Sequence, residues 1–138
     1  KVELAAEMMQ KAKDKGVNLH AQAIVPNQLN IEKVDLAIIL GNLLNNALEA
    51  TQLSRGSVDG EKAFIRLYIA PIKGNLYISI TNSMAINPKS NFLSLKAPNR
   101  QGYGLRRIDQ VVEKNNGIVN RNWENGIFAT EITLPLNQ

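Results

Sequence analysis

The sequence has 138 residues, a net charge of +4 and an ordinary apolar share of 44%, which fits one compact domain with its own core. No apolar run is long enough to span a bilayer, and the first residues do not resemble a secretory signal. Because cysteine is absent, a disulfide framework and a thiolate metal site are both excluded. We therefore expect one cytoplasmic domain over residues 1–138.

The positive charge is concentrated in one stretch of the chain. No acidic residue lies between residues 62 and 108, whereas eight basic residues do: Lys62, Arg66, Lys73, Lys89, Lys96, Arg100, Arg106 and Arg107. A solvated basic surface and an anionic ligand such as a nucleotide both explain this pattern. Nucleic acid is disfavoured, because aromatic residues make up only 5% and no helix is densely basic.

The first half of the chain predicts two helices and one strand. Residues 2–15 have the spacing of an amphipathic helix, which Gly16 ends. Apolar residues alternate over 17–25, as in a strand with one buried face, and Pro26 ends the alternation. Residues 34–53 carry the strongest helical pattern of the chain.

The second half predicts two strand pairs with a helix between them: strands 63–70 and 76–81, a helix from about 105 to 114, and strands 118–123 and 127–134. Turns containing Gly74-Asn75 and Asn125-Gly126 join the paired strands. Residues 83–101 show no clean periodicity, and a loop of that length is more often functional than idle. This order predicts an α+β fold, a two-layer sandwich with helices on one face of a mixed, mostly antiparallel sheet.

The helix predicted over 34–53 is apolar around most of its circumference, which is typical of a core helix. Four polar residues share a narrow sector of it, with Asn45 beside them: Asp35, Asn42, Asn46 and Glu49. Buried amides need partners, so this sector is either a seam bonded to neighbouring loops or a wall of oxygens facing a ligand. Side-chain oxygens of this kind suit Mg²⁺ that keeps waters and phosphates.

Residues 100–107 read Arg-Gln-Gly-Tyr-Gly-Leu-Arg-Arg, and the next helix is expected directly after the second glycine. Glycines allow a ligand to approach the backbone, and the first free amides of a helix attract anions. Alone, this turn is equally a flexible loop that enters a helix.

Together and in this order, these features resemble the catalytic, ATP-binding domain of histidine kinases. That domain belongs to the superfamily shared with DNA gyrase, MutL-type repair proteins and heat-shock chaperone ATPases. The segments DLAIILGNLLNNALEA and RQGYGLRRIDQVVEKNNG are most similar to the peptide-pheromone, quorum-sensing kinases of Gram-positive bacteria. The resemblance covers nearly the whole chain and implies a Bergerat-type ATP-binding fold and an ATP-dependent protein-histidine kinase.

The resemblance also implies roles for the helix residues. Asn46 would hold Mg²⁺ against the triphosphate, and Asn42 would lie near the phosphates, with Asn45 and Glu49 flanking the site. In hydrolytic members of the superfamily a glutamate occupies the position of Asn42 and activates water. Because an amide cannot take a proton, the site is expected to hold ATP without hydrolysing it.

For the second half, the resemblance implies an ATP lid at about 83–101. Lys96 would face the phosphates, and the motif around the two glycines would meet them through its backbone: Gly102, Tyr103, Gly104 and Leu105. Thr130 would lie near the base, and Arg100, Arg106 and Arg107 are candidate helpers.

One position departs from the family pattern. An aspartate followed by Gly-x-Gly usually ends the strand before the lid and accepts a hydrogen bond from the adenine amino group. Here the strand continues into Asn82-Ser83-Met84, without the glycines. The amide oxygen of Asn82 can still accept that bond, but without charge assistance the bond should be weaker.

The expected phosphate acceptor lies outside this chain. His20, the single histidine, is expected on the polar side of a strand, whereas an acceptor should project from an exposed helix. The implied partners are ATP with Mg²⁺, a histidine-bearing dimerisation domain of the same parent protein and a response regulator, without direct membrane contact by this domain. The parent protein is expected in the cell membrane. The alternatives are a degenerate interaction module without catalysis and a serine-directed anti-sigma-factor kinase.

Overall fold

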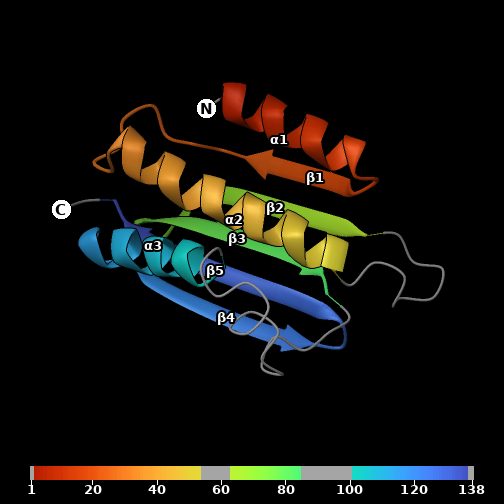
Figure 1. Cartoon of the computed structure of the whole chain (residues 1–138). Coiled ribbons are helices and arrows are strands. Elements are labelled where there is room, and N and C mark those ends of the chain that lie inside the picture. Colours follow the sequence, from red (N-terminus) through yellow and green to blue (C-terminus); the bar gives the residue numbers. More distant parts are fainter. Residues whose placement is uncertain (1, 54–62, 85–100, 137–138) are drawn as a thin grey trace.

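The structure is a computed structural model that describes residues 2–53, 63–84 and 101–136. These residues form three helices and five strands, with the helices on one face of a single sheet (Figure 1). In chain order they are α1 Val2–Asp14, β1 Asn18–Ala23, α2 Lys33–Leu53, β2 Phe64–Ile72, β3 Asn75–Ser83, α3 Gln101–Lys114, β4 Ile118–Glu124 and β5 Ile127–Pro135. None of the described helices is long and apolar enough to cross a membrane.

The sheet has the strand order β1-β2-β3-β5-β4. β1 is parallel to β2, with α2 as the crossover between them, and the remaining neighbours are antiparallel. This architecture confirms the predicted two-layer α+β fold with a mixed sheet.

The core lies between the sheet and α2, which runs across its middle (Figure 1). β3 turns every second side chain toward the helices, from Leu76 through Ile80 to Asn82. The same alternation was predicted for β1, but there Ala21 and Ala23 are exposed. β1 is an edge strand, so it has a neighbouring strand on one side alone.

Two predicted boundaries are wrong. α3 begins at Gln101 rather than near Leu105, so the Gly-x-Gly motif lies inside the first turns of the helix. Glycine is a poor helix former by about 1 kcal/mol, but here the helix packs against α2, and such packing overrides propensity. The first hairpin turns at Lys73-Gly74, both with positive φ, and Asn75 already belongs to β3.

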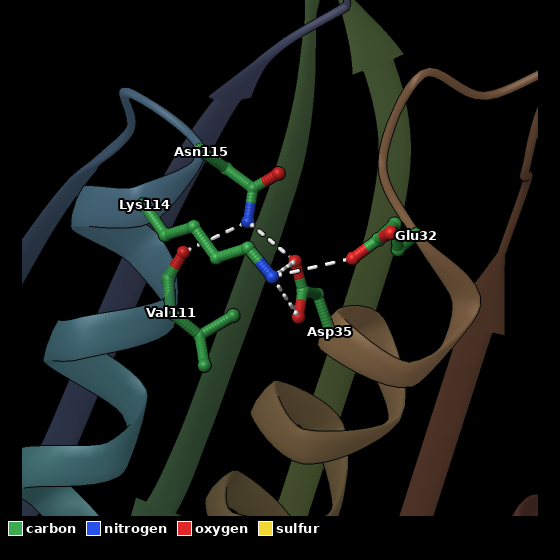
Figure 2. A network of polar contacts seen from close by, with 5 residues as sticks. All are labelled: Glu32, Asp35, Val111, Lys114 and Asn115. Carbon is green, nitrogen blue, oxygen red and sulfur yellow. Dashed lines mark hydrogen bonds and ion pairs between the residues drawn. The ribbon is translucent and has the colours of Figure 1, made fainter.

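A polar network joins the N-terminal end of α2 to the C-terminal end of α3 (Figure 2). The Asp35 side chain is only 4% exposed, and it accepts hydrogen bonds from Lys114 Nζ at 3.2 Å and Asn115 Nδ2 at 3.1 Å. Glu32 also binds Lys114 Nζ, at 3.2 Å, but both of these side chains are largely exposed, so that pair contributes little. Asp35 therefore holds the two helices together. Its hydrogen-bond partners lie on α3 and just after it, not at Asn42 and Asn46.

Replacing Asp35 by asparagine is expected to lower the free energy of unfolding by about 1–3 kcal/mol, because a buried hydrogen-bonded charge is lost. The hydrogen bond to Asp35, and then that to Glu32, raises the pKa of Lys114 above its ordinary value of 10.5. A raised lysine pKa means that this bond stabilises the fold fully below the unfolded pKa and is lost as the pH rises through the folded one. The free energy of unfolding of the parent and of Asp35→Asn should be measured by denaturation from pH 8 to 11.5. The difference between the two free energies should narrow at the alkaline end, and a constant difference would contradict this.

Candidate functional site

The asparagine helix and the glycine motif meet directly in the structure. Gly104 is buried on α3, facing α2. A β-carbon placed on it would lie 3.3 Å from the side-chain oxygens of both Asn42 and Asn46. Such a contact is tighter than most side chains tolerate, so glycine allows the backbone of α3 to approach these two amides.

The two asparagines are bonded differently. Asn42 Nδ2 donates a hydrogen bond of 2.8 Å to the carbonyl of Ile38 one turn earlier, which fixes its amide. Asn46 Nδ2 is buried and has no hydrogen-bond partner among the described residues. An unmet buried amide costs about 1–3 kcal/mol. This cost would be offset if an acceptor of a bound ligand, such as a phosphate oxygen, took a hydrogen bond from Asn46 Nδ2.

A mainly apolar pocket, with Asn46 in its lining, lies between α2 and the sheet. Its walls come from α2, β3 and the residue after it, α3 and β5: Leu43, Asn46, Ala47, Ala50, Ile80, Asn82, Met84, Leu105, Phe128 and Thr130. Asn82 and Thr130 are 2% and 3% exposed, so they are polar groups inside an apolar wall. Asn82 Nδ2 donates to the carbonyl of Ser83 at 3.1 Å, an arrangement that engages the amide nitrogen and leaves the oxygen as its acceptor.

Of the residues singled out in the sequence, four line this pocket together: Asn46, Asn82, Leu105 and Thr130. Asn42 lies beside them against Gly104. Asn45 is exposed, and Glu49 is half-buried without lining the pocket.

The remaining predictions fall partly outside the described residues. Lys96 and Arg100 lie there, as does most of the predicted lid. Gly102 and Tyr103 belong to the first turn of α3. Arg106 is exposed on that helix, and His20 is exposed on β1.

The sequence interpretation missed most of the apolar lining. Strand periodicity would have found Ile80 and Met84, which lie two residues on either side of Asn82, and Phe128, two residues before Thr130. Helical spacing from Asn46 would have found the α2 members in the same way: Leu43 and Ala50.

The arrangement suits a ligand with a flat, mostly apolar part and an anionic part. An apolar pocket with a few placed polar groups is typical of small-molecule sites. Amide oxygens and the amides of a helix N-terminus suit Mg²⁺ and phosphate, respectively. The described residues contain no cluster of three or more His, Cys, Asp or Glu side chains for a metal.

Comparison with known proteins identifies the family. Residues 31–135 match the model of the GHKL domain family, so the chain belongs to the GHKL family. No curated protein sequence matches the chain significantly.

Solved histidine kinase structures share the fold. The nucleotide-free catalytic domain of histidine kinase ThkA superposes with a TM-score of 0.74 at 17% identity, covering 97% of this chain and 88% of that domain. The histidine kinase domain of the blue-light activated kinase from Erythrobacter litoralis gives 0.69 at 17% identity, with coverages of 98% and 62%. Full-length ShkA, solved with AMPPNP, gives 0.72 at 19% identity, and this chain spans 28% of it. The fold is thus that of histidine kinase catalytic domains.

Proposed function

We propose that this chain binds Mg²⁺–ATP between α2, α3 and the sheet and presents it for phosphoryl transfer to a histidine on a separate dimerisation domain. The observation that carries the proposal is the close approach of Gly104 to both asparagine side chains, where a β-carbon would crowd them. It brings the two halves of a nucleotide site together beside a pocket suited to a base. The nitrogen of the Asn46 amide beside it has no hydrogen-bond partner among the described residues.

Each residue has a role in this proposal. Asn46 holds the metal ion, Asn42 lies near the phosphates, and the backbone amides at Gly102 and Gly104 receive the phosphate oxygens. ATP supplies the phosphoryl group, and Mg²⁺ would neutralise its charge. Lys96 is proposed to face the phosphates from the lid.

The base is proposed to enter the apolar pocket. Its exocyclic amino group would donate to the Asn82 oxygen, since the Asn82 nitrogen is engaged by Ser83. Thr130, which also lines the pocket, would add a hydroxyl. This bond is neutral, so base recognition relies mainly on the apolar walls.

Water activation is not supported by the residues present. Asn42 occupies the place of a general base, but its amide cannot accept a proton, and its nitrogen is committed to Ile38. The site therefore positions ATP and awaits a nucleophile from elsewhere. The same proposal has three further parts. The parent protein belongs to the peptide-pheromone subgroup and is anchored in the membrane, this domain lies in the cytoplasm, and a response regulator acts downstream.

The test is γ-labelled ATP given to this chain alone and to the protein that joins it to the histidine-bearing domain. The isolated chain should gain no label and release phosphate only at the background rate, whereas the joined protein should gain acid-labile phosphohistidine. Asn46→Ala in the joined protein should abolish the label. Efficient hydrolysis by the isolated chain would contradict the role given to Asn42, and acid-stable label on a serine would favour the anti-sigma kinase.

A further inference from the structure

The tip of the β4–β5 hairpin forms hydrogen bonds with both backbone groups of Met84, the residue that directly follows β3. Its N–H donates to the carbonyl of Gly126 at 2.7 Å. Its own carbonyl accepts a hydrogen bond of 2.7 Å from the indole Nε1 of Trp123. The main chain of Met84 is therefore fixed by two contacts from one hairpin tip, residues 123–126.

The Met84 side chain connects this hairpin tip to the pocket. It is 2% exposed and forms a small cluster with Ala50 at the end of α2, on which Trp123 and Phe128 pack. Met84, Ala50 and Phe128 all line the pocket beside Asn82. The hairpin tip itself adds no lining residue among those described, so it reaches the pocket only through Met84 and Phe128.

A methionine at this place makes the backbone anchor important. Methionine has three rotatable bonds and fills irregular gaps, so its side chain does not fix its own position. The main chain fixes the point from which this side chain enters the pocket wall, and the hairpin tip holds that main chain.

We propose that Trp123 and Gly126 are positioning residues for the nucleotide, which act through Met84 to set the shape of the base end of the pocket. This inference rests on the proposed function. It adds a second support to the site, independent of the α2–α3 contact at Gly104. The hairpin tip determines how well the base fits, whereas Asn46 and Gly104 determine how the phosphates and the metal ion are held.

A matched pair of glycines tests the inference. Gly126 and Gly74 occupy equivalent hairpin turns with φ of +81° and +83°, and a β-carbon on either meets nothing within 4 Å. The carbonyl of each accepts a bond from another segment, from Met84 N at 2.7 Å and from Leu136 N at 2.9 Å. The two turns lie at opposite ends of β3, so alanine should strain both equally but disturb the pocket only from Gly126.

We expect Gly126→Ala to raise the Kd for Mg²⁺–ADP by about threefold to tenfold, the size expected for one displaced hydrogen bond, and Gly74→Ala to leave it unchanged. Both variants should show the same fall in thermal midpoint. Equal affinities for ADP in the two variants would overturn the inference. Failure of the unaltered protein to bind ADP would instead overturn the proposed function, so the two failures are distinguishable.

Trp123→Phe supplies a readout that a merely structural role would not move. The phenyl ring can still pack on Met84, but the donor to its carbonyl is gone. The loss of ADP affinity should be the same with Mg²⁺ and with EDTA, because the base end is affected. Asn46→Ala, in contrast, should lose affinity mainly with Mg²⁺. A loss of ADP affinity in Trp123→Phe that is seen only with Mg²⁺ would overturn the assignment to the base end. If this variant does not fold, the comparison of Gly126→Ala with Gly74→Ala decides.

Discussion

Gly117→Ala is expected to lower the free energy of unfolding by about 3 kcal/mol, the upper end of the usual cost of overpacking. Gly117 follows α3, where its N–H donates to the carbonyl of Val112 at 2.8 Å, and its backbone lies directly against β5. A β-carbon there would lie 2.5 Å from the carbonyl oxygen of Thr133 and 2.6 Å from Leu134 Cδ2. Neither neighbour can yield easily, because one is backbone within the sheet and the other is a fully buried side chain.

Gly41→Ala is the matched control for this prediction. Gly41 lies in the middle of α2, and a β-carbon on it would meet nothing within 4 Å. Alanine should therefore be neutral or stabilising by up to about 1 kcal/mol, through helix propensity alone. Urea denaturation with a shared m-value measures both changes. A Gly117→Ala variant as stable as the parent would show that the backbone at Gly117 does not lie against β5 as described.

Asn46→Ala is expected to weaken Mg²⁺–ADP binding by at least about 100-fold. Groups that merely support a metal ligand cost about 10–100-fold in metal affinity when they are lost, and the proposal makes Asn46 the ligand itself. Its neighbour Asn45 provides the control, because it is the same residue type on the same helix but exposed. Asn45→Ala should bind ADP as the parent does.

The Asn46→Ala substitution should not destabilise the fold. Asn46 Nδ2 is buried without a partner among the described residues, and alanine removes that unmet group from the helix. Relief of the desolvation cost, together with the higher helix propensity of alanine, should leave the variant as stable as the parent or more so. Lost binding with retained stability is what separates a ligand-binding residue from a structural one.

Most of the fold followed from periodicity in the sequence. The apolar helix at 33–53 and the alternation in β3 are strong patterns because both elements are buried on the faces that the patterns indicate. The Asn125-Gly126 turn was predicted from its residues, and both have the positive φ that this pair tolerates. The start of α3 was not predictable locally, since glycine disfavours a helix and the approach of Gly104 to α2 joins segments far apart in the sequence.

The sequence predicted some of the residues that the structure brings together, and the differences have physical reasons. Asp35 shares the angular sector of Asn42 but lies seven residues earlier, about 10 Å along the helix axis, where it meets Lys114 and Asn115 instead. Angle alone therefore could not assign it. The role of Met84 was equally hidden, because its contacts with Trp123 and Gly126 depend on strand pairing across the sheet rather than on any local pattern.

The most direct test of the account is calorimetric titration of Mg²⁺–ADP into the parent chain, Asn46→Ala and Asn45→Ala. We expect saturable binding to the parent and to Asn45→Ala, and no measurable binding to a folded Asn46→Ala. Equal binding by all three would place the nucleotide elsewhere, and absence of binding to the parent would contradict the nucleotide site itself.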